Sequence, residues 1–213
     1  LAATDRGVMI VEADALRTLH AMDEGGALSL RVDDAEQLWV GGRGRVHVFG
    51  GREARALRLP AGAEAATVTS LARHDGRWWA GGDTGLYVLE GDHWRPQADV
   101  PATNGGVQAL HEDRDGILWA STKDTLYRMR GGRLMERIGA SGALAEIRVF
   151  YEDRESNLWL GSNSEGASRV WNGWTRRFSR AEGLAQPLLW SIAQDPQGRA
   201  WVGSDDGVSV FEG

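Results

Sequence analysis

The sequence contains no cysteine, few prolines and no long apolar run. Without cysteine the protein has no disulfide, no thiolate zinc site and no thiol nucleophile, although this says nothing about its compartment. The longest apolar runs, such as Val8 to Val11, are far shorter than the ~20 residues that span a bilayer. We therefore expect no membrane contact from this segment.

Basic residues are also scarce relative to acidic ones. The 24 Lys and Arg residues stand against 30 Asp and Glu residues, for a net charge of −6. Because nucleic-acid-binding proteins need a cationic surface to neutralise phosphates, we expect no nucleic-acid partner. The chain opens at Leu1 without a methionine or a basic leader. That start indicates a processed protein or a piece of a longer one.

Tryptophan is abundant, and half of the tryptophans are periodic. Of the 10 tryptophans, five recur at spacings of 40, 40, 40 and 42 residues. They are Trp39, Trp79, Trp119, Trp159 and Trp201. The segment Leu1 to Thr4 is a sixth copy, with leucine in place of tryptophan. A fixed period of this length indicates internal structural repeats.

The residues around each tryptophan repeat as well. An aspartate stands six positions before it in four units, as Asp33, Asp113, Asp153 and Asp195, and the third unit has Arg73 instead. An aspartate at the start of a turn usually caps backbone N–H groups, so we expect these four to be turn-capping residues. Gly7, Gly85 and Gly207 precede the next apolar segment, where a tight turn needs a positive φ.

Each unit contains several short β-like segments. In the fourth unit they cover residues 107–112, 118–121, 126–130 and 133–138. Four strands in a repeat of about 40 residues is typical of a β-propeller blade. We therefore predict an all-β β-propeller with six repeat copies and five to six blades, either an imperfectly closed ring or an arc of a larger, seven-bladed propeller. The single domain or fragment divides into units at about 1–24, 25–62, 63–102, 103–142, 143–184 and 185–213.

Residues 107–119 resemble the two-component regulator propeller repeat, with an apolar strand, an Asp, a D-G turn and a Leu-Trp pair. Residues 147–161 and 189–203 resemble it too, whereas Leu1, Arg73 and Ser121 depart from its pattern. The resemblance implies a periplasmic or extracytoplasmic propeller ahead of a transmembrane helix and a histidine kinase or diguanylate cyclase output. It further implies a non-catalytic input domain that binds a small molecule or an oligosaccharide and needs no cofactor.

Most tryptophans are expected to be structural. The five repeat tryptophans have a fixed place in every unit, which favours packing between neighbouring sheets, and Trp94 and Trp174 share a second repeat position. Trp78, Trp171 and Trp190 have no tryptophan counterpart and are better functional candidates. The turn at Asp113 lacks the remaining ligands of a calcium loop, and the five histidines have no metal-ligand spacing, so we predict no metal. No catalytic motif is present.

Ligand contacts are expected where the repeat is broken, because repeat scaffolds carry specificity at such positions. We predict them on the turns between second and third strands and on the inter-blade loops. Basic side chains there suit a carboxylated or sulfated sugar, and a tryptophan supplies a stacking surface. Ordinary solvated loop charges are the alternative. The candidates are Arg43, Arg45, Lys123, Asn163, Gln186 and Trp190, with Asn104, Asp124, Glu165 and Asp205 as further repeat-breaking positions.

Two other functions stay open at this point. A propeller enzyme of the lyase or lactonase type would need a metal or a general base, and no histidine-rich or acidic cluster recurs in the units. A protein-interaction platform is the third hypothesis, since unclosed blade edges at both termini would invite homodimerisation or pairing with another chain.

Overall fold

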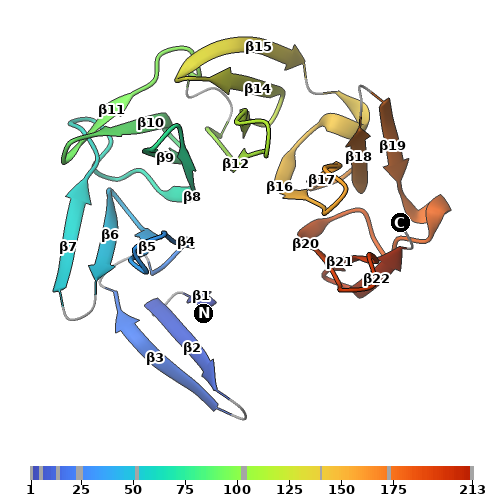
Figure 1. Ribbon diagram of the computed structural model, residues 1–213, viewed down its shortest axis with the longest axis horizontal. Coiled ribbons are helices and arrows are strands. Elements are labelled where there is room, and N and C mark those ends of the chain that lie inside the picture. The colour runs from blue at the N-terminus through green and yellow to red at the C-terminus, as the bar shows by residue number, and fades with distance from the viewer. Residues whose placement is uncertain are drawn as a thin grey trace. The chain divides into compact units, whose positions relative to one another are not determined.

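The computed structural model describes residues 2–4, 7–12, 15–22, 26–50, 53–101, 105–139, 141–171 and 174–211. These residues form 22 β-strands, and their helices are two short 3-10 turns, η1 (Gly142–Leu144) and η2 (Arg180–Glu182). Neither of these two helices has the length or apolarity needed to cross a membrane. The predicted all-β class is confirmed (Figure 1).

The chain divides into two compact units, Leu1–Val107 and Gln108–Gly213, and each is described by itself. The first unit holds three sheets in which strands adjacent in sequence pair antiparallel. Sheet 1 contains β1 (Ala2–Thr4), β2 (Gly7–Glu12) and β3 (Ala15–Ala21). Sheet 2 contains β4 (Ser29–Val32), β5 (Leu38–Gly41), β6 (Arg45–Gly50) and β7 (Glu53–Arg58). Sheet 3 contains β8 (Val68–His74), β9 (Arg77–Gly82), β10 (Gly85–Glu90) and β11 (His93–Pro96).

The second unit repeats this arrangement. Sheet 4 contains β12 (Ala109–Glu112), β13 (Leu118–Ser121), β14 (Thr125–Arg130) and β15 (Arg133–Gly139). Sheet 5 contains β16 (Ile147–Glu152), β17 (Leu158–Ser162), β18 (Ala167–Trp171) and β19 (Trp174–Phe178). Sheet 6 contains β20 (Leu189–Gln194), β21 (Ala200–Ser204) and β22 (Gly207–Phe211). Each of the six sheets falls within one of the six repeat units that the sequence delimits, and the strands of the fourth unit differ from the predicted ones by at most two residues at an end.

The turn between the first and second strands is held by an aspartate in four sheets. In sheet 5, Asp153 Oδ1 accepts the backbone N–H groups of Glu155 and Asn157 at 3.1 and 2.7 Å, and its Oδ2 accepts the Trp159 indole N–H at 2.8 Å. The same indole–carboxylate bond joins three further pairs at 2.7 to 2.9 Å: Trp39 to Asp33, Trp119 to Asp113 and Trp201 to Asp195. One carboxylate therefore fixes both the turn and the tryptophan that packs behind it.

These hydrogen bonds affect the acidity of two of the aspartates. Burial raises the pKa of Asp33. Hydrogen bonds from the Trp39 indole and from the N–H groups of Gln37 and Ala35 lower this pKa by more than burial raises it, so it lies below its usual value. At Asp195 burial likewise opposes the shift. The bonds from the Trp201 indole and from the backbone and side chain of Arg199 nevertheless lower the pKa of Asp195 to about 2. Both carboxylates are therefore ionised in the folded state at neutral pH.

Sheet 3 closes the same turn differently because Arg73 replaces the aspartate. Asp75 and Gly76 have φ values of 51° and 72°, and His74 pairs with Arg77 on either side of them. Positive φ at both central residues is the geometry of a two-residue hairpin turn, as the Asp-Gly dipeptide predicts. Trp79 is 1% exposed, and its indole Nε1 has no hydrogen-bond partner among the described residues.

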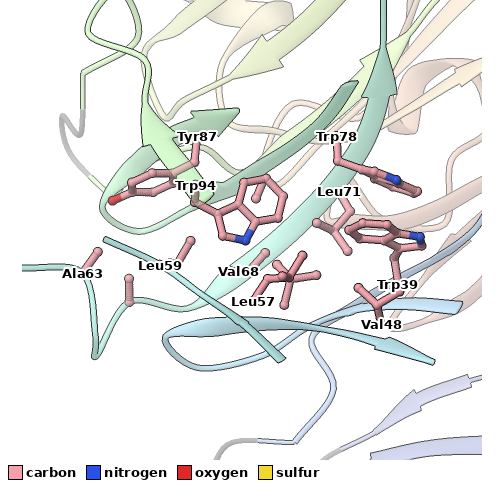
Figure 2. Packing of buried hydrophobic residues seen from close by; sticks show 13 residues of the cluster. Trp39, Val48, Leu57, Leu59, Ala63, Val68, Leu71, Trp78, Tyr87 and Trp94 are labelled. Atoms are coloured by element: carbon pink, nitrogen blue, oxygen red, sulfur yellow. The ribbon is translucent and has the colours of Figure 1, made fainter. Parts of the chain in front are cut away.

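The hydrophobic core lies in the gaps between neighbouring sheets of each unit. Between sheets 2 and 3, the rings of Trp39 and Trp78 stack with centroids 4.3 Å apart, and Val48 and Leu71 pack around them (Figure 2). Between sheets 4 and 5, Trp119 shares a cluster with Leu158. Four of the repeat tryptophans are 1–9% exposed, whereas Trp201 in sheet 6 is 40% exposed. Sheet 3 covers the ring of Trp39. The described residues include no sheet after β22, so the ring of Trp201 has no such cover among them.

Three glycines, the first residues of β2, β10 and β22, adopt the positive φ that the sequence predicts. Gly7, Gly85 and Gly207 have φ values of 123°, 119° and 124°. At Gly7 a Cβ atom would lie 2.2 Å from the His20 carbonyl oxygen. Both the backbone conformation and the close approach of the neighbouring strand therefore require glycine there.

Candidate functional site

The turns between second and third strands lie at one edge of the sheets, together with the loops that enter each first strand. In the second unit this edge, here called the turn edge, comprises residues 122–124, 146–148, 163–166, 186–190 and 205–206. Lys123 and Asn163 come from the turns of adjacent sheets and both contact Glu146. The Glu146 N–H donates to the Lys123 carbonyl at 3.1 Å, and the Asn163 N–H donates to the Glu146 carbonyl at 2.9 Å.

The side chains of these three residues also meet. Lys123 Nζ lies 3.6 Å from Glu146 Oε1, and Asn163 Nδ2 donates to Glu146 Oε2 at 3.2 Å. Glu146 has a φ of 52°, in the left-handed region that few residues other than glycine adopt. The structure thus brings two predicted candidates together through a residue that the sequence did not single out.

Trp190 is an exposed aromatic ring with a fixed orientation. It is 56% exposed, and its indole N–H donates to Asp205 Oδ1 at 2.7 Å. Asp205 lies in the turn between β21 and β22, so the bond ties the first strand of sheet 6 to its second turn. An exposed tryptophan held by a hydrogen bond offers a flat apolar surface at little conformational cost.

Trp190 stands at a β-bulge, and the neighbouring sheet has a matching bulge. Leu189 pairs with Ser204 and Ser191 pairs with Gly203, which leaves Trp190 as the extra residue. In β16 the pairs Ile147–Ser162 and Val149–Gly161 leave Arg148 in the same position. Arg148 is exposed, and β16 and β20 are neighbours. Bulges commonly re-aim a side chain next to a site.

Sequence reasoning missed Arg148 and Glu146. Arg148 stands 42 residues before Trp190, the same interval that separates Trp159 from Trp201. Extending the repeat alignment to the loops would therefore have paired Arg148 with Trp190. No sequence signal marks Glu146, because its role depends on backbone geometry.

Among the other predicted positions of this edge, Asp124 and Glu165 have hydrogen-bond partners in their own turns. Gln186 is half-buried beside Pro187, whose carbonyl accepts the Gly166 N–H at 3.1 Å. Asp124 Oδ1 lies 3.2 Å from the hydroxyls of both Thr122 and Thr125, so this carboxylate stabilises its own turn. The Glu165 N–H donates to Ser162 Oγ at 3.1 Å. Asn104 lies outside the described residues.

Arg43 and Arg45 belong to the first unit. Arg43 is exposed and forms an isolated bridge with Thr67, and Arg45 is half-buried at the start of β6, paired in register with Arg58. Thr67 itself is held by Asp83, which accepts its N–H at 3.0 Å and its hydroxyl at 2.8 Å. These two arginines therefore form a basic turn of their own unit.

The tryptophans without counterparts have different surroundings. Trp78 is 7% exposed and stacked on Trp39, so its indole is part of the core. The side chain of Trp171 lies outside what the structure describes. Trp190 is the member of this group that the described structure leaves accessible. In the described part of the chain, no three His, Asp or Glu side chains gather as metal ligands would.

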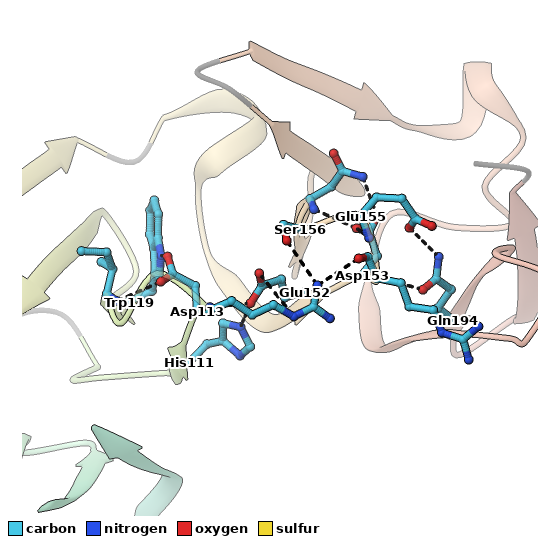
Figure 3. A network of polar contacts seen from close by, with 12 residues as sticks. His111, Asp113, Trp119, Glu152, Asp153, Glu155, Ser156 and Gln194 are labelled. Carbon is cyan, nitrogen blue, oxygen red and sulfur yellow. Dashed lines mark hydrogen bonds and ion pairs between the residues drawn. The ribbon is translucent and has the colours of Figure 1, made fainter. Parts of the chain in front are cut away.

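The opposite end of the same sheets carries a repeated brace (Figure 3). Arg114 donates its N–H to Glu152 Oε2 at 2.8 Å and a guanidinium N–H to the Arg154 carbonyl at 3.1 Å. One unit further on, Arg154 donates to Gln194 Oε1 at 3.1 Å and to the Pro196 carbonyl at 3.4 Å. The turns at this end are thus linked from sheet to sheet.

Comparison with known proteins confirms the repeat family at two places. Residues 102–124 and 183–206 match the family model described as "Two component regulator propeller". No curated protein matches the chain. The predicted resemblance is thus confirmed on the fourth and sixth repeat units.

Solved structures confirm the propeller fold. The extracellular domain of BT3049 from B. thetaiotaomicron, described as a hybrid two component system, is 16% identical with a TM-score of 0.57, over 98% of this chain and 36% of that one. PorZ, a surface component of the type-IX secretion system of Porphyromonas gingivalis, is 11% identical with a TM-score of 0.74, over 98% and 36%. Virginiamycin B lyase from Staphylococcus aureus is 12% identical with a TM-score of 0.68, over 88% and 70%. The chain spans about a third of the first two structures.

Proposed function

We propose that this chain, which carries two-component regulator propeller repeats, is a non-catalytic, extracytoplasmic ligand-sensing domain of a signal-transduction protein. The family match supports this, as do similar structures that are extracellular domains of proteins described as two-component systems. The output domain, a histidine kinase or a diguanylate cyclase, lies outside these residues. The likeness to virginiamycin B lyase concerns the fold, and a propeller fold by itself carries no activity.

The observation that carries the proposal is the pair of matching bulges on sheets 5 and 6. Trp190 offers an exposed indole fixed by Asp205, and Arg148 offers an exposed guanidinium at the equivalent position of the next sheet. A guanidinium binds a carboxylate or sulfate through two parallel hydrogen bonds, and an indole packs against the apolar face of a sugar ring. The ligand we propose is therefore a small acidic molecule or an acidic oligosaccharide.

Lys123 extends the same edge to sheet 4. Its side chain is 57% exposed despite the contact of its ammonium group with Glu146, and Asn163 adds an amide beside that contact. A ligand that touches Arg148 and Trp190 bridges two sheets. It would favour whichever arrangement of those sheets it fits best, and a bound ligand shifts a conformational equilibrium only through such a difference in affinity.

Titration calorimetry with an oligogalacturonate, a chain of carboxylated sugars, tests the proposal. The native protein should bind it, and Trp190→Ala and Arg148→Gln should each weaken binding about tenfold, the effect of losing one stacked ring or one charged hydrogen bond. Met135→Ala and Arg133→Gln are matched controls, because these residues are exposed on β15 away from the turn edge. Equal binding by all four variants would contradict the proposal, as would failure of native protein to bind any of a panel of acidic sugars and small acids.

A further inference from the structure

A cavity of about 280 Å³ lies between sheets 5 and 6, away from the turn edge. The turns between the first and second strands of these two sheets form its rim, and the repeat tryptophan Trp159 lies in its wall. The volume corresponds to roughly nine water molecules at liquid density. The cavity therefore suits a small molecule of about the size of a monosaccharide.

The cavity exists because one repeat position carries a small residue. Ala200 stands immediately before the repeat tryptophan of sheet 6, where sheet 3 has Trp78 and sheets 4 and 5 have leucine. Between sheets 2 and 3 the Trp78 indole stacks on Trp39, the counterpart of Trp159. Ala200 leaves the corresponding space beside Trp159 open. Sheet 6 thus departs from the repeat at a position whose side chain fills the gap elsewhere.

Charged groups of both signs line the cavity, and they have partners within the protein. The Asp153 carboxylate is 4% exposed and accepts from the Trp159 indole, the Asn157 amide and two backbone N–H groups. The Arg169 guanidinium lies over the Trp159 ring, 5.6 Å from its centroid. A cationic ligand would be repelled by Arg169, and an anionic ligand would be repelled by Asp153 and Glu155. The cavity therefore favours a neutral ligand.

Uncharged hydrogen-bonding groups of the same cavity are open to a ligand. The Tyr151 hydroxyl and the Gln197 side-chain amide line the cavity, and neither of them is engaged by another residue in the described part of the chain. Asn157 donates an amide N–H to Asp153 Oδ2 at 2.8 Å, which leaves its own Oδ1 as an acceptor. These three side chains offer both donors and acceptors.

Glu155 adds a carboxylate at the rim. It is exposed, and its Oε2 accepts one amide N–H from Gln194 at 3.1 Å (Figure 3). A carboxylate has about four acceptor sites, so Glu155 can accept further N–H or O–H groups. Because a hydroxyl group both donates and accepts, a ligand with several hydroxyls matches this mixture of groups without adding a charge.

We infer that this cavity binds a neutral polyhydroxylated molecule of the size of a monosaccharide. Glu155 and Asn157 accept hydrogen bonds from its hydroxyls, and Tyr151 and Gln197 donate to them. Its carbon ring fills the space that Ala200 leaves. The inference rests on the cavity and not on the acidic ligand proposed for the turn edge, so a sensor with both sites would respond to two ligands.

Calorimetry and thermal unfolding with a panel of common hexoses, pentoses and myo-inositol test this inference on the whole chain. At least one member of the panel should bind and raise the melting temperature. Counterparts of that ligand in which a carboxylate or an ammonium group replaces a hydroxyl should bind at least tenfold more weakly. The charged counterparts are measured on the double variant Arg148→Gln, Trp190→Ala, so that the turn edge does not contribute.

Single substitutions test the assigned contacts. Tyr151→Phe removes only a hydroxyl and Glu155→Gln removes only a charge, and each should weaken binding about threefold to tenfold. Asp115→Asn is the matched control for Glu155→Gln, because Asp115 is exposed at the equivalent position of the turn in sheet 4, and it should leave binding unchanged. Unchanged binding by both Tyr151→Phe and Glu155→Gln would contradict the assignment.

Ala200→Leu is the decisive variant because it restores the residue of sheets 4 and 5. It should fill the cavity, keep or raise the melting temperature and abolish binding of the neutral ligand. Ala200→Val, which adds less volume, gives a second test if the leucine is too large. Binding that survives both substitutions, or the absence of binding by any member of the panel, would overturn the inference. Trp190→Ala should leave binding of the neutral ligand unchanged, which separates failure of this site from failure of the turn edge.

Discussion

The gap between sheets 2 and 3 and the gap between sheets 5 and 6 are built from the same repeat positions, yet one is filled and the other is open. In the first, Trp39 stacks on Trp78 at 4.3 Å and both rings are buried. In the second, Trp159 faces a position occupied by Ala200, and a cavity with charged walls remains. The tryptophan is kept in both gaps, and the residue opposite decides whether the gap is core or site.

Sheets 3 and 5 also differ in how their repeat tryptophans are anchored. Trp159 donates to Asp153, whereas Trp79, the repeat tryptophan of sheet 3, has a buried indole N–H without a partner among the described residues. Sheet 3 thus depends on aromatic packing, and sheet 5 depends on a hydrogen-bonded turn. The repeat tolerates either solution because each one fixes the first turn of its sheet.

The largest effect is expected from Trp78→Ala, which makes the filled gap resemble the open one. Loss of a buried tryptophan costs about 3–5 kcal/mol through the lost burial and the cavity left behind. Urea unfolding measures the change in the free energy of unfolding. Trp78→Leu, the residue of the next two repeats, should cost less and serves if the alanine variant does not fold. A loss no greater than that of Met135→Ala, an exposed control, would contradict the packing account.

A smaller difference is expected between Trp159→Phe and Trp79→Phe. Trp159→Phe removes a hydrogen bond to a buried carboxylate, an interaction of about 1.5–3 kcal/mol, whereas Trp79→Phe removes a buried N–H that has no partner. We therefore expect Trp159→Phe to be more destabilising by about 2 kcal/mol. Denaturant unfolding of the two variants under one condition checks this. Equal losses would show that the Asp–Trp bond does not stabilise its sheet.

The smallest expected effect is a change in how the stability of the fold depends on pH under acidic conditions. Because the pKa of Asp195 is lowered to about 2 in the folded protein, its contribution to stability is complete above its unfolded value of about 3.9 and is lost as the pH falls toward 2. Asp33 acts in the same direction. Melting temperatures measured between about pH 5 and pH 2 should fall less steeply for Asp195→Asn than for the native chain. Parallel pH profiles would contradict this assignment.

The periodic part of the structure could be predicted from the sequence. Trp119 and Asp113 recur at one spacing because every sheet needs the same turn and the same packing, so the strand ends of the fourth unit could be placed within two residues. Periodic residues are repeated evidence for one local geometry, which makes such a prediction strong.

The features that do not repeat along the chain could be predicted only in part from the sequence. Trp78 was a functional candidate because it lacks a tryptophan counterpart, but it is stacked in the core. Extending the repeat alignment to the loops would have paired Arg148 with Trp190, but the sequence does not show the bulge at which each of them stands. The cavity at Ala200 depends on a missing side chain in one sheet and a retained ring in the next. Such features require knowledge of which residues face each other.

The central claim is that a ligand binds at the turn edge of the second unit, and hydrogen–deuterium exchange on the native chain with and without an acidic oligosaccharide tests it most directly. We expect slower exchange in the bulged segments around Arg148 and Trp190 and at the Asn163 amide, with no change in the braced turns around Arg114 and Arg154. Protection confined to those braced turns, or no protection with any acidic ligand that binds, would contradict the account.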